Sequence, residues 1–278
     1  MQFIDWRAYA PGDHRIGCPS CGRGKADKSA GLTIDRDGNG VLHCFRCSHV
    51  ETYRPERGVA YRAPAVAPAR KAQESKREAL SDWGLDFWQH CSPLAGVALE
   101  YLKFRRCFIP PADGDLRWHP SVKHGPSGHT GPALVALITD ALTGKALSLH
   151  RTWITATGKA NVTPARLVLS GHATKGGCIR LWPDDCVTGG LALAEGIETA
   201  LSVAHAFTPV WATVDAGHMA DFPVLAGVEV LTICQDNDPA GHKAAAACTA
   251  RWVDARRTVR VTRQAANDFN DILTRAAA

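Results

Sequence analysis

Two pairs of closely spaced cysteines near the N-terminus constrain the fold of this chain more than any other feature. Cys18 and Cys21 form one C-x2-C pair, and Cys44 and Cys47 form the second. Each pair lets two thiolates reach one ion, and two pairs complete the tetrahedral shell of a closed structural zinc site. Because the surrounding segment has few large apolar residues, a metal is expected to hold it folded. We therefore predict a zinc ribbon over residues 1–54 with one structural Zn²⁺.

The flanks of these cysteines carry cations and one aromatic side chain, Phe45. Two interpretations stay open. Phe45 stacks on a base of single-stranded nucleic acid while the cations meet its phosphates, or the segment is an ordinary solvated surface. His43 and His49 are either alternate metal ligands or surface histidines, and the second interpretation is favoured. The cations are Arg15, Arg23, Lys25, Lys28 and Arg46.

Length and composition indicate a soluble globular protein of about two domains, because 278 residues exceed the roughly 100–200 residues of one domain. No apolar run approaches the ~20 residues of a membrane helix, so no membrane partner is expected. The N-terminus lacks an apolar signal-peptide core, which predicts a reducing, cytoplasmic location. The formal net charge of +5 permits an anionic partner such as nucleic acid without requiring one.

The pattern along the chain changes after the ribbon. Apolar residues recur at helical spacing over 79–106, strand-like runs follow at 133–139, 146–154 and 165–170, and strands then alternate with helices up to the end. The late strands are almost continuously apolar, which is typical of a parallel sheet buried on both faces. We predict an α/β protein with a linker at 55–78, an α+β, β-rich subdomain at 79–186, and a parallel-sheet α/β subdomain at 187–278.

Acidic residues follow the strands of the last subdomain. Glu195 ends the run LALAE, and Asp236 and Asp238 follow the run LTIC, each directly before a predicted helix. Ligands of open α/β sheets bind at the carboxyl ends of the strands, so these carboxylates are expected to converge and to suit a hard cation such as Mg²⁺. Each acid alone is more typical of a helix cap or first turn than of a metal site, but three together favour a metal site. Asp268 and Asp271 are further candidates near the C-terminus.

The glutamate-glycine pair at 195–196, the Asp-Asn-Asp-Pro-Ala-Gly run at 236–241 and the Asp-Phe-Asn-Asp run at 268–271 resemble the Toprim fold. Bacterial-type primases, type IA and II topoisomerases and some nucleases share that fold. With a four-cysteine ribbon in front, the chain resembles the zinc-finger Toprim DNA primases of phages, plasmids and mobile elements, relatives of the primase part of phage primase-helicases. Two features depart from that pattern: the gap between the cysteine pairs is longer, and no Walker A sequence is present.

The resemblance implies a DNA primase that makes short RNA primers from NTPs on a single-stranded DNA template by Mg²⁺- or Mn²⁺-dependent nucleotidyl transfer. It further implies either a separate replicative helicase as a partner or priming that is independent of a helicase. Whether Glu195 acts as general base or as metal ligand stays open. The implied catalytic residues are Glu195, Asp236, Asp238 and Asp268, and the implied magnesium ligands are Glu195, Asp236, Asp238 and Asp271.

A polymerising site also needs cations for the triphosphate and the template, and the middle subdomain supplies them. The run Lys-Phe-Arg-Arg at 103–106 resembles the basic motif of the primase polymerase core. About half of all the cations in this subdomain are expected to be bystanders, and His150 is expected to be a hydrogen-bonded strand residue. The predicted nucleotide- and template-binding residues are Lys103, Arg105, Arg106, Arg151, Lys159 and Arg180.

Three alternatives were weighed against a primase. A Toprim nuclease uses the same acids on an existing phosphodiester, and a non-enzymatic zinc-bearing DNA-binding or recombination-mediator protein uses the domain only to bind. A topoisomerase is disfavoured because all four tyrosines (Tyr9, Tyr53, Tyr61 and Tyr101) precede the Toprim segment. The six cysteines outside the ribbon have no metal-binding spacing and are predicted to be small buried hydrophobic residues.

Overall fold

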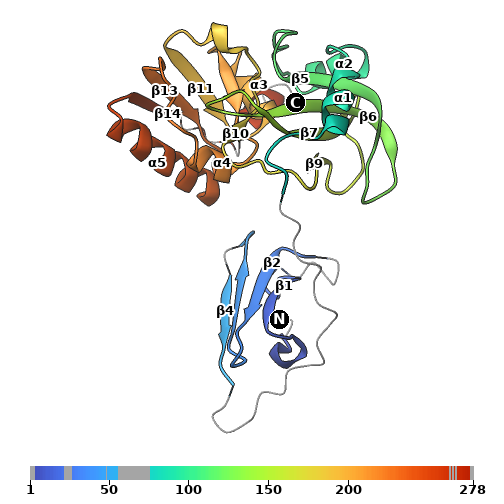
Figure 1. Cartoon of the computed structure of the whole chain (residues 1–278), viewed down its shortest axis with the longest axis vertical. Coiled ribbons are helices and arrows are strands. Elements are labelled where there is room, and N and C mark those ends of the chain that lie inside the picture. Colours follow the sequence, from blue (N-terminus) through green and yellow to red (C-terminus); the bar gives the residue numbers. More distant parts are fainter. Residues whose placement is uncertain are drawn as a thin grey trace. The chain divides into compact units, whose positions relative to one another are not determined.

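The computed structural model describes residues 4–21, 27–47, 49–55, 76–262, 264, 266 and 268–275. The chain divides into two compact units, unit 1 over Met1–Glu74 and unit 2 over Ser75–Ala278 (Figure 1). The boundary falls within the linker predicted at 55–78, most of which lies outside the described residues. In the part of the chain that is described, no helix combines the length and the apolar character needed to cross a membrane.

Unit 1 is a four-stranded antiparallel sheet, in the strand order β1-β2-β3-β4, that follows a short 3-10 helix at Trp6–Ala8. Alternate residues of β2 and β3 are buried and pack with Trp6 in a small core. The first cysteine pair follows β1, and the second begins at the last residue of β3. The strands are β1 (Gly12–Ile16), β2 (Ala30–Ile34), β3 (Gly40–Cys44) and β4 (Val50–Tyr53).

The first half of unit 2 is a six-stranded antiparallel sheet with two short helices. Strands β6 and β7 form its centre, and helix α2 contacts both. Ser81 begins α1 by accepting a hydrogen bond from the Gly84 N–H, as an N-cap does. The elements are α1 (Asp82–Gln89), α2 (Val97–Phe104), β5 (Leu116–Lys123), β6 (Thr130–Asp140), β7 (Ala146–Thr155), β8 (Gly158–Lys159), β9 (Arg166–Val168) and β10 (Gly177–Cys178).

The second half of unit 2 is a parallel four-stranded sheet in the order β12-β11-β13-β14. Leu191 and Leu193 of β11 pack in a core with α4 and α5, whereas Ala192 and Ala194 pack in a core with α3. Burial on both faces explains the continuous apolar runs. The elements are β11 (Gly190–Ala194), α3 (Ile197–Val203), β12 (Val210–Ala212), α4 (Ala216–Ala220), β13 (Val230–Cys234), α5 (Pro239–Asp254), β14 (Thr258–Thr262) and α6 (Phe269–Arg275).

The two halves of unit 2 share one core and lie side by side (Figure 1). That core joins Leu116 and Leu134 of the antiparallel sheet to Ala194 and Ile197. A backbone bridge also connects the halves, since Ile179 and Ala212 exchange hydrogen bonds of 2.8 and 3.1 Å. The shared core fixes the loops of one sheet against the strand ends of the other.

The fold class predicted from sequence is confirmed: an antiparallel ribbon, a β-rich α+β half, and a parallel α/β half. Several elements are shorter than their sequence patterns. The strand-like run at 165–170 gives only the three residues of β9. Strand β12 also has three residues, and Val214 shortly after it adopts a positive φ of 74°, which ends the extended chain. Strand β5 and helix α4 were not anticipated.

Candidate functional site

The four cysteines of unit 1 converge at one end of the antiparallel sheet. The Sγ atoms of Cys18 and Cys47 lie 3.7 Å apart, those of Cys21 and Cys44 lie 3.9 Å apart, and all four lie within 4.8 Å of one another. Burial alone would raise the pKa of Cys44, but hydrogen bonds from backbone N–H groups of Cys47 and Arg46 outweigh it and lower the pKa to about 6. A closed set of four thiols with one favoured thiolate fits a structural metal site.

The acids of unit 2 lie at the carboxyl ends of the parallel strands. Glu195 directly follows β11, Asp236 follows β13 by two residues, and Asp268 directly precedes α6. The chain reverses sharply after β13: a Cβ on Gly241 would lie 2.8 Å from the Glu195 Oε1 atom and 2.5 Å from the Asp236 carbonyl oxygen. Glycine at 241 therefore lets the loop approach Glu195.

Glu195, Asp236 and Asp268 line one cavity of about 390 Å³ between the two halves of unit 2. The acids come from the parallel-sheet half of unit 2, and the three cations Arg105, Lys159 and Arg166 come from the antiparallel half. The described residues that line it are Arg105, His150, Lys159, Arg166, Leu167, Val168, Glu195, Gly196, Glu198, Thr199, Val214, Asp215, Asp236 and Asp268.

The acids of this cavity are electrostatically strained. Burial, together with the nearby charges of Asp236 and Asp238, raises the pKa of Glu195 to about 7. Burial and the charges of Asp268 and Asp238 likewise raise the pKa of Asp236 to about 6. Within the described residues, Glu195 Oε1 and Asp236 Oδ1 are buried without a hydrogen-bond partner. Such buried, unpartnered oxygens are costly unless a cation or a proton meets them.

A divalent cation fits the cavity because it would bind these two unpartnered carboxylate oxygens. The donors are carboxylates, which Mg²⁺ and Mn²⁺ prefer. The carboxylates are nevertheless more widely spaced than the thiols of the cysteine set. Among the described residues, the four cysteines are the one group of three or more metal-binding side chains whose ligand atoms all lie within 4.8 Å of one another. Mutual repulsion of carboxylates accounts for that spacing.

Two of the predicted acids act as helix caps. The Asp238 side chain accepts a 2.7 Å hydrogen bond from the Gly241 N–H and begins α5. Asp268 precedes α6, and its Oδ1 accepts a 2.7 Å hydrogen bond from the N–H of Asp271, which lies in the first turn of that helix. Asp238 and Asp268 therefore have capping roles, whereas Glu195 Oε1 and Asp236 Oδ1 have no hydrogen-bond partner among the described residues.

The structure separates the predicted cations into two groups. Arg105 and Lys159 line the acid cavity. Lys103 and Arg106 are exposed at the end of α2 and outside the cavity lining. Arg151 follows His150 in β7 and so projects from the opposite face of the sheet, where it lies over Trp153 and donates to the Val168 carbonyl at 3.4 Å.

Arg180 is a structural cation in this arrangement. It is 7% exposed, pairs with Asp184 at 2.7 Å, and lies over the Trp211 ring. It also hydrogen-bonds the Thr139 hydroxyl and the carbonyls of Asp140 and Ala141. Through these contacts the Arg180 guanidinium connects β6 to the parallel half of unit 2.

Sequence reasoning did not single out Glu198 and Asp215, which line the cavity together with Arg166, one of the cations of the middle subdomain. Glu198 accepts a hydrogen bond from the Tyr101 hydroxyl at 2.7 Å and pairs with Lys159 at 3.0 Å. His150 also differs from expectation, because its Nδ1 is buried without a partner among the described residues and burial lowers its pKa to about 4. The run Glu-Thr-Ala-Leu-Ser after Gly196 offered a signal for Glu198, since a charge there is unusual in an otherwise small and apolar helix.

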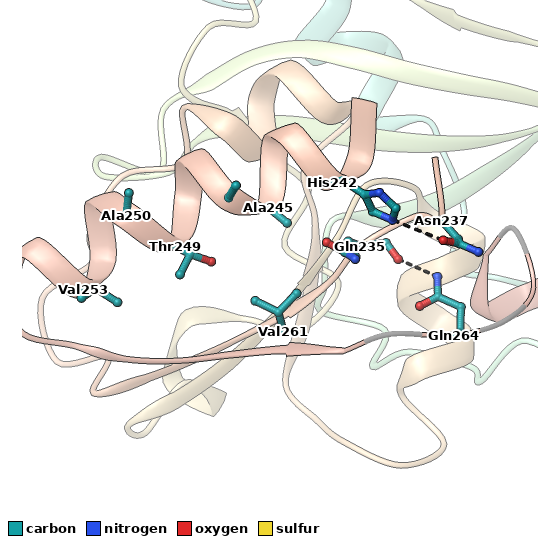
Figure 2. Close-up of a pocket in the computed structure, with 10 residues that line it drawn as sticks. Gln235, Asn237, His242, Ala245, Thr249, Ala250, Val253, Val261 and Gln264 are labelled. Carbon is teal, nitrogen blue, oxygen red and sulfur yellow. Dashed lines mark hydrogen bonds between the residues drawn. The ribbon is translucent and has the colours of Figure 1, made fainter. Parts of the chain in front are cut away.

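A larger cavity of about 880 Å³ lies elsewhere, between α5 and the edge strand β14. Figure 2 shows small apolar side chains such as Ala245, Ala250 and Val261 along its walls. At one end His242 contacts Asn237 at 3.2 Å, and Gln264 donates to the Gln235 carbonyl at 2.6 Å (Figure 2). Because none of the described residues that line this cavity is an aspartate, glutamate, lysine or arginine, we place the candidate site in the smaller one.

Two protein families match segments of unit 2. Residues 78–181 match a family described as a domain of unknown function, DUF7146. Residues 190–278 match the Toprim domain family. The second segment contains β11 through α6, and hence Glu195, Asp236 and Asp268. No curated protein sequence matches the chain.

Solved primase structures are similar to the chain. The primase fragment of the bacteriophage T7 primase-helicase protein is 17% identical, with 95% of each chain covered and a TM-score of 0.43. The zinc-binding and RNA polymerase domains of the Aquifex aeolicus primase are 16% identical, with 96% of this chain and 76% of that chain covered and a TM-score of 0.44.

Proposed function

We propose that this Toprim-domain protein is a DNA primase that joins NTPs into short RNA primers on a single-stranded DNA template. The observation that carries the proposal is the cavity that Glu195, Asp236 and Asp268 line together with Arg105, Lys159 and Arg166. Nucleotidyl transfer needs both the acids and the cations. The acids bind divalent cations, and the cationic side chains let anionic phosphates approach that cluster of carboxylates.

Glu195 and Asp236 are the residues that would hold Mg²⁺ or Mn²⁺, with Asp268 beside them. A bound divalent cation supplies Lewis-acid stabilisation of phosphate oxygens and lowers the pKa of an attacking hydroxyl. Arg105, Lys159 and Arg166 would bind and orient the triphosphate from the antiparallel half of unit 2. Glu195 is a candidate general base as well, because its pKa of about 7 lies near neutral pH.

In the same proposal, unit 1 binds zinc through its four cysteines and binds the single-stranded DNA template. Phe45 is 63% exposed, the Arg15 guanidinium lies 4.4 Å from its ring centroid, and His43 meets the ring edge-on at 5.0 Å. An exposed aromatic ring beside a cation is suited to stacking on an unpaired base while the cation meets a phosphate.

The decisive assay incubates the full chain with Mg²⁺, labelled NTPs and single-stranded DNA and looks for short oligoribonucleotides. An Asp236→Asn variant should lose about a thousandfold or more of this activity, because one metal-binding carboxylate is gone. The matched control is Asp254→Asn, an exposed acid at the end of α5, which should retain full activity. Degradation of the DNA without synthesis would favour the nuclease, and binding without either reaction would favour the mediator.

A further inference from the structure

The ion pair of Lys159 and Glu198 joins the two halves of unit 2 at the wall of the acid cavity. Lys159 belongs to β8, which pairs with β7, and Glu198 belongs to α3, which begins two residues after Glu195. The Nζ and Oε1 atoms lie 3.0 Å apart. The Lys159 side chain is one-third exposed and the Glu198 side chain is 9% exposed, so a solvent-facing cation is anchored on a buried anion.

Glu198 is itself held in place. The hydroxyl of Tyr101, a fully buried residue of α2, donates to the same Oε1 atom at 2.7 Å. The Ser202 hydroxyl donates to the Glu198 carbonyl oxygen at 2.8 Å. Burial would raise the pKa of Glu198, but the Lys159 charge and the Tyr101 hydrogen bond outweigh it and lower the pKa to about 2. Glu198 is therefore a fixed, permanently ionised partner at neutral pH.

Lys159 lines the same cavity as Glu195 and Asp236. Glu195 Oε1 and Asp236 Oδ1 are both buried without a hydrogen-bond partner among the described residues. A lysine ammonium sits on a flexible four-carbon stem, so a Lys159 without an anchor would turn toward these carboxylates. Pairing with them would relieve their repulsion and would occupy the oxygens that a divalent cation needs.

We propose that Glu198 is a positioning residue that holds the Lys159 ammonium away from Glu195 and Asp236 and so keeps both carboxylates available to a divalent cation. The inference rests on the metal site of the proposed function. It concerns competition between a lysine and a metal ion for the same oxygens, and it does not depend on which reaction follows.

The test is a double-mutant cycle on Mn²⁺ affinity, measured by isothermal titration calorimetry on the full chain with its cysteines loaded with zinc. Glu198→Gln should raise the Mn²⁺ Kd about tenfold, because the released Lys159 competes for the carboxylates. Lys159→Met alone should change the Kd by less than about twofold, since Glu198 already restrains that charge. The double variant should return to within about twofold of the wild-type Kd.

A long-range charge effect gives a different pattern. If Lys159→Met tightened Mn²⁺ binding equally in the wild-type and Glu198→Gln backgrounds, the two effects would be additive and the positioning role would be refuted. An unchanged Kd in Glu198→Gln would refute it as well. Tyr101→Phe is the matched control, because it removes a hydrogen bond to Glu198 but keeps the ion pair, and its Kd should stay within about twofold of wild type.

Folding of each variant is checked by its thermal transition. If Glu198→Gln does not fold, Glu198→Asp replaces it, because aspartate keeps the charge but shortens the side chain. Glu198→Asp should raise the Mn²⁺ Kd when Lys159 is present and leave the Kd unchanged when it is combined with Lys159→Met. If the Glu198 and Lys159 substitutions are coupled in their effect on the Mn²⁺ Kd but the chain makes no primers, only the proposed function is contradicted. If the chain makes primers but the two substitutions are not coupled, only this inference is contradicted. A wild-type chain that binds no Mn²⁺ would overturn both.

Discussion

The cysteine set of unit 1 and the acid cavity of unit 2 are two candidate metal sites built in opposite ways. The four Sγ atoms of the ribbon lie within 4.8 Å of one another on a small sheet, with no cationic side chain needed to complete the set. In the cavity, carboxylates stand further apart, two of their oxygens are unpartnered, and three cations line the same cavity.

The difference indicates what each site is suited to do. Four soft thiolates fill a tetrahedral shell and leave no open position, so the ribbon suits a metal that holds a fold. Hard oxygen ligands in an open cavity leave positions for phosphate and water, so the cavity suits chemistry. The ribbon has only a small hydrophobic core, so we expect its folding to depend on a metal, whereas unit 2 has a large hydrophobic core.

The largest contrast is expected when one ligand of the ribbon is removed. Cys44→Ser should abolish zinc binding and unfold unit 1, because zinc contributes roughly 10–16 kcal/mol to the folding of such small modules. Unit 2 should melt as before. Zinc content by mass spectrometry and limited proteolysis measure both effects. The control is Cys186→Ser, since Cys186 lies outside the ribbon and is exposed, contrary to the burial predicted for it. Retention of one zinc per chain in Cys44→Ser would contradict the assignment.

The cavity should respond to pH. Protons compete with a cation for Glu195 and Asp236, whose pKa values are raised to about 7 and about 6. Mn²⁺ affinity should therefore fall about a hundredfold between pH 8 and pH 5.5, as both carboxylates become protonated. Calorimetric titrations across that range measure the effect. A flat profile would show that these two groups do not bind the metal.

The exposed ring of the ribbon provides a smaller effect. Phe45→Ala should weaken binding of single-stranded DNA about tenfold, because one base loses its stacking partner. The loss should persist at high salt, since stacking does not depend on phosphate charge. Fluorescence anisotropy with an oligonucleotide measures it. Val50→Ala, at another exposed apolar position of the same sheet, should bind as wild type does, and equal losses would argue against stacking.

The smallest effect concerns stability without metal. The folded-state pKa of Asp236 is raised, so its contribution to stability is present at low pH and is lost as pH rises through about 6. Asp236→Asn should therefore raise the Tm at pH 7.5 in EDTA by about 2–4 °C, equivalent to about 1 kcal/mol after solvent screening. The two proteins should melt alike at pH 4.

Asp238→Ala is the matched comparison for that melt. It removes the N-cap of α5 and should lower the Tm by a similar amount, because a lost cap costs about 1 kcal/mol. Opposite signs for neighbouring aspartates would separate the metal-site acid from the capping acid. A lower Tm for Asp236→Asn in EDTA would show that its charge stabilises the fold.

Several features of the fold and the site follow from local sequence. The two C-x2-C pairs, the apolar strands and the acids within two residues of the ends of β11 and β13 are short-range patterns, and periodicity and spacing report such patterns well. The orientation of the cations is another matter. Arg105 and Arg106 are adjacent, yet only Arg105 lines the cavity, because Arg106 adopts a positive φ of 53° after α2 ends.

The sequence by itself determined the fold class, the cysteine set and the position of the acids at strand ends, because each depends on neighbours in the chain. Only the tertiary structure decided which charges meet. Glu198 finds Tyr101 and Lys159 across 97 and 39 residues, and Arg180 and Arg151 turn out to be committed elsewhere. Those outcomes depend on how two sheets share one core, and no local pattern records that packing.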